Sequence, residues 1–376
     1  MESGFNFRTI GLLLLVVLGG LSFAQEREEG KLPRVRVSGD KKSFILGTSD
    51  RPFVPWGFNY LGREGSLAEE EWETAEGWRR IEDDFAAMKK LGANVVRWHL
   101  QFETYMAGPE KVKAESLARL KKLLAVARAA GLYLDLTGLG CYRLKRSPAW
   151  YDALSEEDRW KAQARFWDAI AQTCAGDSVV FCYDLMNEPV ITESKEGEHP
   201  WLTGELGGFH FVQRISNKPA SRDTKEIAEA WVKALVEPIR RRDKETLITV
   251  GVIPWAFVWP NAKPFFYSPE VAKHLDFASI HVYPKSGELE KELKALAVYE
   301  VGMPLVIEEI FPMTCSTKEL DAFIDVASPR VDGWVGHYFG LSAAEHRKEG
   351  TIAGAMKGEF LEYWGRKGKE FSNPDR

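Results

Sequence analysis

The chain has 376 residues, of which 45% are hydrophobic and 12% aromatic, enough to bury one large core and too many for a disordered chain. Its formal net charge of −5 offers no basic surface for nucleic-acid phosphates, so we expect an uncharged partner and no nucleic acid. A single domain of this length is ordinary for a barrel of eight βα units.

The N-terminus has the composition of a signal peptide. Arg8 precedes an apolar run over residues 10–23, and Ala24 ends a small-residue cleavage site. We therefore predict that residues 1–24 are removed and that the mature protein is secreted or periplasmic, with no stable membrane insertion. An uncleaved membrane anchor is the alternative, which is less favoured because the run is short and contains Gly19-Gly20.

Residues 25–52 are predicted to form an N-terminal extension with a short hairpin. Residues 34–37 and 43–46 alternate apolar and polar side chains, and Gly39-Asp40 between them is a turn sequence. Such a hairpin could close one end of a barrel that occupies residues 53–370.

From Phe53 onward, short apolar runs alternate with longer segments of helical period, which is the pattern of an α/β fold. The strands are expected at residues 54–59, 94–99, 133–137, 179–186, 246–252, 277–281, 305–309 and 331–336. The helices between them include residues 78–91, 114–130, 156–173, 225–241 and 289–301. An open doubly wound sheet would carry a glycine-rich phosphate loop after its first strand, and the sequence after residue 56 is not one. Eight alternations therefore predict a (β/α)8 TIM barrel, which we expect to be a monomer.

The connection over residues 190–222 is too long for an ordinary loop and carries Trp201, His210 and Phe211. Connections of this length within a compact domain are usually functional. We therefore expect a wall or lid over the active-site cleft.

Cysteines and histidines give no sign of a metal site. The seven histidines are scattered without the spacing of metal ligands, so we expect no metal and no other cofactor. The pairing of the cysteines cannot be deduced from the sequence; they are Cys141, Cys174, Cys182 and Cys315. Cys182 lies in an apolar run, which favours a buried free thiol.

The active site of such a barrel lies at the carboxyl ends of its strands, so the polar or aromatic residues that close the apolar runs are the candidates. These residues are Asn59, Tyr60, Arg97, His99, Asp135, Thr137, Asn187, Glu188, Trp255, His281, Tyr283, Glu309, Trp334 and His337. Glu188 and Glu309 come from well-separated strands and could face each other, and glycosidic cleavage needs two such carboxyl groups. A glutamate at a strand end is also commonly a salt-bridged surface residue, so the pair alone does not decide.

Four short motifs supply the missing context. Residues 184–189 (Asp-Leu-Met-Asn-Glu-Pro) resemble the fourth-strand Asn-Glu-Pro motif of clan A glycoside hydrolases, in particular the cellulase and mannanase family 5. Residues 94–97, 279–283 and 304–309 resemble the second-, sixth- and seventh-strand motifs of that family, in the same order. The resemblance spans roughly residues 53–340.

The resemblance implies a retaining glycoside hydrolase that cleaves β-linked polysaccharide or oligosaccharide of the β-glucan or β-mannan class. Glu188 would be the general acid/base and Glu309 the nucleophile, and Asn187 would bind the 2-hydroxyl of the sugar. A transglycosylase would use the same residues, and a catalytically weak carbohydrate-binding barrel is a further alternative.

Other residues at the barrel mouth are expected to bind substrate: Asn59, Arg97, Trp255, His281, Tyr283, Trp334 and His337. Arg97 and Tyr283 would favour the ionised form of Glu309, and His281 could tune the acid/base. Structural roles stay open for these residues, because Arg97 could pair with Asp135 and the tryptophans could be packing residues.

Two positions depart from the family pattern. Thr137 stands where the third strand often has a histidine, and His337 stands where an eighth-strand tryptophan usually forms the floor of the subsite beside the cleavage point. The substrate preference therefore stays open.

Glu308 and Glu309 are neighbours, and alternation along a strand places only one of them in the barrel mouth. The resemblance assigns the nucleophile to Glu309, because the family motif places an apolar or aromatic residue after it, here Ile310. Glu308 would then point toward the surrounding helices and form an ion pair there.

Overall fold

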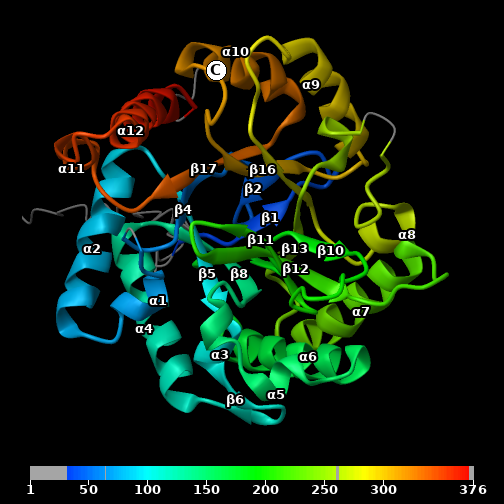
Figure 1. Ribbon diagram of the computed structural model, residues 1–376. Helices are drawn as coiled ribbons and strands as arrows, with labels where there is room; N and C mark the ends of the chain where they lie inside the picture. Colours follow the sequence, from blue (N-terminus) through cyan, green and yellow to red (C-terminus); the bar gives the residue numbers. More distant parts are fainter. Residues whose placement is uncertain (1–31, 64, 260–261, 372–376) are drawn as a thin grey trace, which may run out of the picture.

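The computed structural model describes residues 32–63, 65–259 and 262–371. Within these residues nine parallel strands form one sheet that rolls into a barrel (Figure 1). They are β4 (Trp56–Tyr60), β5 (Val95–Gln101), β8 (Tyr133–Gly140), β9 (Val180–Asp184), β13 (Leu247–Thr249), β14 (Gly251–Val252), β15 (Ala278–Val282), β16 (Leu305–Ile310) and β17 (Gly333–Phe339). β13 pairs with β9 and β14 with β15, so these two short strands together occupy the fifth position. The predicted (β/α)8 barrel is confirmed, with its fifth strand broken in two.

Helices cover the outside of the barrel (Figure 1). The longer ones are α2 (Ala75–Lys90), α4 (Ala114–Ala130), α6 (Glu156–Cys174), α7 (Thr224–Arg242), α9 (Leu289–Leu296), α10 (Thr317–Ala327) and α12 (Ile352–Phe371). The shorter ones are α1 (Ala68–Glu71), α3 (Phe102–Tyr105), α5 (Ala149–Asp152), α8 (Pro269–Ala272) and α11 (Ala343–Lys348), with 3-10 turns η1 (Leu144–Arg146), η2 (Trp255–Phe257), η3 (Ala297–Tyr299) and η4 (Ser328–Arg330). Sequence signals explain their ends. The Ser155 side chain caps α6, and Gly131 ends α4 with a φ of +67°.

The N-terminal strands close the lower end of the barrel, where the strands begin. β1 (Val35–Val37) and β2 (Phe44–Leu46) form an antiparallel hairpin, and β3 (Pro52–Phe53) pairs with β2. The ring of Phe44 is fully buried, with its centroid 5.4 Å from Phe181 and 5.3 Å from Phe277. The hairpin therefore acts as an apolar plug.

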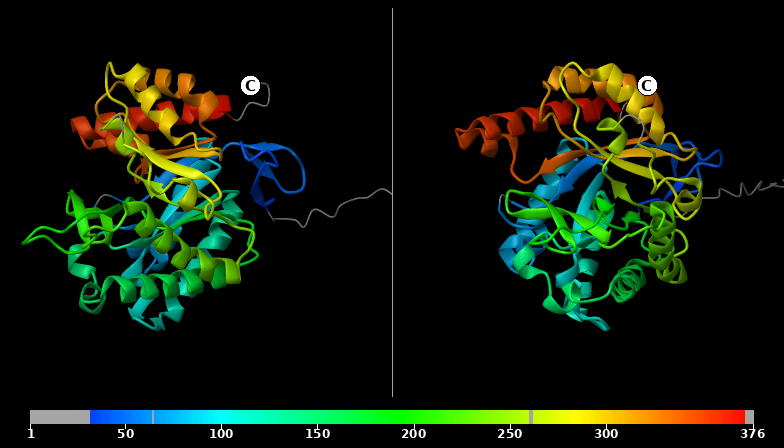
Figure 2. Two further views of the ribbon diagram at one scale, coloured as in Figure 1. Left: turned by 90° about the vertical axis from the view of Figure 1, so that its right-hand side faces the viewer. Right: turned by 45° about the vertical axis from the view of Figure 1, so that its right-hand side comes forward.

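The long connection after β9 is a small sheet rather than an irregular loop. β10 (Pro189–Ile191) pairs with β12 (Phe209–Ser216), which pairs in turn with β11 (Leu202–Leu206). We call the β11–β12 hairpin, residues 202–216, the ribbon. It crosses the mouth of the barrel in Figure 1, and Figure 2 shows it at the end opposite to the N-terminal hairpin. A further short hairpin, β6 (Met106–Gly108) with β7 (Lys111–Val112), lies between α3 and α4.

All four cysteines are free thiols, and three of them are buried, including Cys182. Among the helices of the described residues, none combines the length and the apolar composition that crossing a bilayer would require. The predicted signal peptide lies outside the described residues.

Candidate active site

Arg97, on β5, is the centre of the polar network at the barrel mouth. Its guanidinium is fully buried and donates from Nη1 to Asn59 Oδ1 at 2.9 Å and to Glu309 Oε1 at 2.8 Å. Its Nη2 donates to Asp184 Oδ2 at 2.7 Å and to Asn187 Oδ1 at 2.9 Å. A rigid planar cation thereby fixes residues from β4, from β16 and from the end of β9.

The two asparagines that accept from Arg97 are held from both sides. Asn59 Nδ2 donates to the backbone oxygen of Glu308 at 2.7 Å, and His99 Nε2 lies 3.0 Å from Asn59 Oδ1. Asn187 Nδ2 donates to the backbone oxygen of Phe211 in the ribbon at 3.0 Å. These contacts fix the orientation of both amides before any ligand arrives.

Glu309, on β16, has the environment of an ionised carboxylate. Tyr283 donates its hydroxyl to Oε2 at 2.5 Å, and His281 and His337 each lie 3.7 Å from the same oxygen. Burial alone would raise the pKa of Glu309, but the neighbouring histidines, Arg97 and the Tyr283 hydrogen bond outweigh it and hold the pKa below its usual value. Burial lowers the pKa of His337, whereas the Arg97 guanidinium stays charged at every relevant pH.

Glu188 lies just beyond the end of β9 and faces Glu309. Its Oε1 is 2.9 Å from His281 Nδ1, and its side chain is partly exposed. Its backbone has a φ of +48°, a left-handed conformation that costs about 1–3 kcal/mol for a residue with a side chain. The Glu188 N–H donates to the Gly251 oxygen at 2.8 Å, so the broken fifth strand anchors this strained turn.

A cavity of about 350 Å³ opens above these residues. Its walls come from the strand ends, from α12 and from the ribbon; they are Leu61, His99, Asn187, Glu188, Gly204, Leu206, Phe211, Val212, Tyr283, Glu309, Phe311, Met313, His337, Tyr338 and Lys357. Both carboxyls and His337 therefore line one cavity.

Two predicted binding residues lie elsewhere. The expectation for Trp334 is wrong: the side chain is fully buried and packs against Phe323 of α10, with ring centroids 6.3 Å apart. Val335 faces the barrel interior instead, so the alternation of β17 turns Trp334 toward the helices. Trp255, on η2, lines a separate small cavity together with Pro189 and not the cavity of the two carboxyls.

The prediction for Glu308 is also wrong, because its side chain faces the barrel interior and not the helices. It is fully buried, and its Oε2 lies 3.7 Å from Arg97 Nε. β16 shifts register against β15 after Ile280 and against β17 after Ile307, and these irregularities let two consecutive side chains face inward.

Several residues around the site were not predicted to belong to it. Asp184, the last residue of β9, binds Arg97 and accepts the Gly251 N–H at 2.8 Å. It obeys the strand-end rule and could have been found. Lys357 carries no such signal, because α12 brings it to the mouth from a distant part of the fold. Phe211 belongs to the long connection that was expected to form a wall, and it lines the cavity.

Among the residues that the structure describes, two groups of side chains have the spacing of metal ligands. The ligand atoms of Glu188, His281 and Glu309 lie within 4.8 Å of one another, and so do those of Asp135, Cys182 and Glu308. In the first group every residue already has a hydrogen-bond partner, among them Arg97 and Tyr283 for Glu309. In that group Glu188 and Glu309 therefore form a pair of carboxyl groups of the kind that glycosidic cleavage needs, one as acid and one as nucleophile.

Comparison with known proteins decides the family. The sequence model of the cellulase family, glycosyl hydrolase family 5, matches residues 57–336, which is more than half of the chain. The chain belongs to this family. It is therefore a glycoside hydrolase, and the predicted resemblance is confirmed. No curated protein sequence matches it.

Solved structures similar to this family 5 enzyme include the exo-β-1,4-mannosidase Op5Man5 from Opitutaceae bacterium strain TAV5, with a TM-score of 0.61 and 16% identity over 89% of this chain and 63% of that one. The catalytic domain of the endoglucanase Cel5A of Thermobifida fusca has a TM-score of 0.58 and 16% identity over 89% of this chain and 97% of that one. The endo-1,4-β-mannanase of Eisenia fetida has a TM-score of 0.60 and 14% identity over 88% and 95%. The chain thus spans about two thirds of the length of Op5Man5 and nearly all of the other two. At these identities the likeness shows the fold alone.

Proposed function

We propose that this enzyme hydrolyses β-linked glycans with retention of anomeric configuration, with Glu309 as nucleophile and Glu188 as general acid/base. The spacing of the two carboxyls carries the proposal, because oxygens of Glu188 and Glu309 lie within 4.8 Å of each other. Retaining glycosidases hold their carboxyls about 5–5.5 Å apart, whereas inverting enzymes leave roughly 6.5–9.5 Å for a water molecule.

In the first step a Glu309 oxygen attacks the anomeric carbon and forms a glycosyl ester. The bond to the leaving oxygen breaks, and that oxygen takes the proton of Glu188. In the second step Glu188 removes a proton from water, the water oxygen attacks the same carbon, and Glu309 leaves as a carboxylate. Water entry and product exit restore the starting state.

Neighbouring groups support these separate roles of Glu309 and Glu188. The Arg97 guanidinium and the Tyr283 hydroxyl stabilise the ionised nucleophile. His281 orients the Glu188 carboxyl from the side. Asn187, fixed between Arg97 and the ribbon, would donate to the 2-hydroxyl of the sugar, a contact that strengthens in the transition state.

The substrate class follows from the family and from its structural relatives. Cellulase is the family description, and similar structures include mannanases and an endoglucanase. We therefore propose β-1,4-linked glucan or mannan. Hydrolysis of matched cello- and manno-oligosaccharides, followed by proton NMR, tests both parts: a β-anomer as first product supports retention, and an α-anomer contradicts it.

We also propose export of the enzyme with cleavage near Ala24. N-terminal sequencing of protein recovered outside the cytoplasm should begin at or near Gln25. Recovery of Met1 on membrane-bound protein would favour the anchored alternative.

A further inference from the structure

The ribbon forms part of the wall of the catalytic cavity. Gly204, Leu206, Phe211 and Val212 all line it, facing residues that come from the opposite side of the mouth. Leu206 is 62% exposed although it is apolar, and Met313 across the cavity is 52% exposed. Exposed apolar side chains on both edges of the cavity indicate a binding rim for the apolar faces of sugar rings.

The ribbon is tied to the barrel close to the catalytic residues. The Phe211 oxygen accepts from Asn187, and the His210 N–H donates to the Tyr142 oxygen at 2.8 Å. Gln213 Nε2 donates to the Leu139 oxygen at 2.6 Å. These bonds join the ribbon to the ends of β8 and β9, so the ribbon is a fixed part of the wall.

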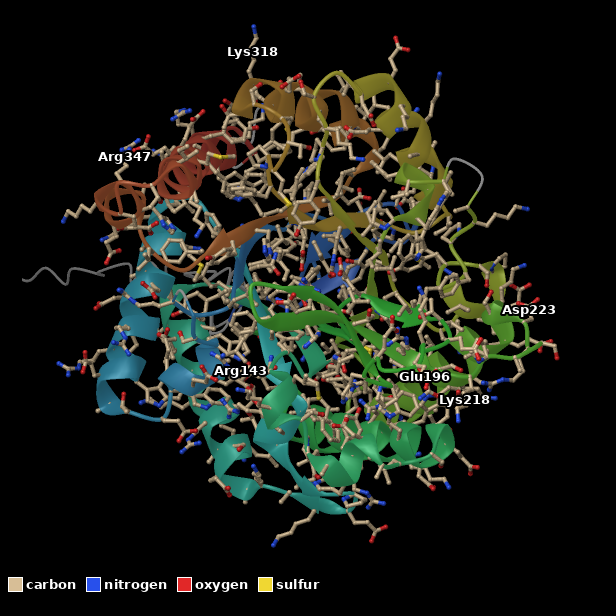
Figure 3. All side chains as sticks on the ribbon, viewed as in Figure 1. Arg143, Glu196, Lys218, Asp223, Lys318 and Arg347 are labelled. Carbon is tan, nitrogen blue, oxygen red and sulfur yellow. The ribbon has the colours of Figure 1, made fainter. Side chains whose placement is uncertain are left out.

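The ribbon is also closely packed. Its two strands pair from Leu202 opposite Gln213 to Leu206 opposite Phe209. A Cβ on Gly204 would lie 2.5 Å from a Val212 methyl group, so glycine at this position allows the strands to lie flat over the cavity. On the outer side, Arg143 lies 4.8 Å above the Phe209 ring, and Figure 3 shows Arg143 beside the mouth.

The cavity above the two carboxyls is small and open to solvent on one face. Its 350 Å³ is near the lower end of the roughly 300–1,000 Å³ of pockets for small ligands. Its walls come from the ends of β4, β5, β9, β15, β16 and β17 and from the ribbon. Trp255, on the arc of β14, is outside it. A volume of this size suits a short glycan segment better than a long chain on both sides of the cleaved bond.

We infer that the ribbon limits the glycon side of the site to a short pocket, so that the enzyme removes short units from the non-reducing end of a β-glycan. The inference rests on the proposed function, because it assumes that Glu188 and Glu309 cleave the bond. Asn187, which would bind the 2-hydroxyl of the glycon, lines the pocket and places the glycon there. The leaving part of the chain extends past Glu188 toward solvent.

Product analysis of the wild-type enzyme tests this inference. Cellohexaose and mannohexaose, each with a fluorescent label at the reducing end, are digested to low conversion. We expect unlabelled mono- or disaccharide together with a labelled chain shortened by that unit. Labelled products of all lengths from the start, with a rapid fall in the viscosity of soluble polysaccharide, would overturn the inference while leaving the proposed function intact. If the wild type cleaves neither oligosaccharides nor aryl β-glycosides, the proposed function itself fails.

A shortened ribbon gives the stronger test. Deleting Glu205, Leu206, Phe209 and His210 removes two facing pairs and keeps the Gly207-Gly208 turn and the remaining register. We expect this variant to release labelled products of intermediate length, and to lose about tenfold in kcat/KM on an aryl monoglycoside as sugar-stacking contacts disappear. Unchanged products in a variant with wild-type Tm would overturn the inference.

Leu206→Ala provides a second test of the inference if the deletion variant does not fold. Its side chain is largely exposed, so the substitution should spare the Tm, and it should raise KM for disaccharides about threefold through lost apolar contact. Lys318→Ala is the matched control, because Lys318 points into solvent at the periphery of the molecule (Figure 3). An equal KM for Leu206→Ala and the control would contradict a binding role for the rim.

Discussion

The two halves of the barrel interior are built from the same strands and have opposite chemistry. In the lower half Val95, Val306 and Val335 pack against Phe44 of the N-terminal hairpin. In the upper half the same strands supply Arg97 from β5 and Glu308 and Glu309 from β16. One half is an apolar plug that stabilises the fold, and the other is a buried network of charges that positions the chemistry.

The upper half contains more acidic side chains than basic ones. Arg97 is surrounded by Asp135, Asp184, Glu308 and Glu309, with contacts between 2.7 and 3.9 Å. Four buried carboxylates beside one guanidinium would repel one another strongly, so some of these carboxyl groups must be protonated. Burial, with the nearby acids, raises the pKa of Glu308 well above its usual value, and burial raises that of Asp135 to about 7.

The largest effect should come from Glu309→Ala, which removes the nucleophile from the upper half. We expect turnover to fall by several orders of magnitude while the Tm changes little. Added azide should restore part of the activity on an activated aryl glycoside, giving a glycosyl azide of inverted configuration. Rescue of a Glu308→Ala variant instead would move the nucleophile by one residue.

Glu188→Gln should have the next largest effect, and the effect should depend on the leaving group. Glycosides with poor leaving groups need protonation and should be cleaved far more slowly, whereas activated aryl glycosides should form the glycosyl-enzyme almost normally. Rates on the two substrate types, measured side by side, check this. An equal loss on both would argue against the acid role.

Phe44→Ala tests the lower half. Because the ring is fully buried against Phe181 and Phe277, its removal should cost about 3–5 kcal/mol in the free energy of unfolding. The value of kcat/KM at low temperature should stay within about twofold, since no catalytic group touches the plug. Urea denaturation and steady-state kinetics measure the two quantities. A large kinetic loss in a folded variant would show that the halves are coupled.

The difference between the two halves explains which features of the fold and the site could be predicted from the sequence. Apolar runs and glycine stops located the strands and helices, because these patterns depend on local spacing. The site was found where strands end in polar residues. The predictions failed at Glu308 and Trp334, where the strand register decides which side a residue faces. A register shift in β16 depends on the neighbouring strands and leaves no mark in the sequence of β16 itself.

The ribbon shows a second limit. The length of residues 190–222 predicted a functional segment, and Phe211 does line the cavity. The pairing of β10, β11 and β12 was not predicted, because its strands are short and one of them pairs in parallel. Lys357 could not be assigned from sequence either, since only closure of the barrel brings α12 to the mouth.

Glu308→Gln should have the smallest effect, and its pH dependence is the informative part. Glutamine resembles the protonated form of Glu308, so at pH 5 the variant should have nearly the wild-type Tm and activity. In the wild type the folded state holds a proton that the unfolded chain loses above the ordinary carboxyl pKa. The free energy of unfolding therefore falls as the pH rises toward the raised pKa values of the folded state, and the raised pKa of Asp135 is about 7. This loss amounts to at most about 1.4 kcal/mol per pH unit for each proton. Glutamine has no such proton to lose, and Asp135 can then ionise opposite Arg97 with less repulsion. The difference in free energy of unfolding, variant minus wild type, should therefore become more favourable to the variant between pH 5 and pH 8.

Urea denaturation across this range measures the difference, with Lys318→Ala as a control that should have the same pH dependence as the wild type. A variant destabilised by several kcal/mol at every pH would mean that Glu308 is ionised and paired with Arg97, and that the upper half holds its charges in a different arrangement.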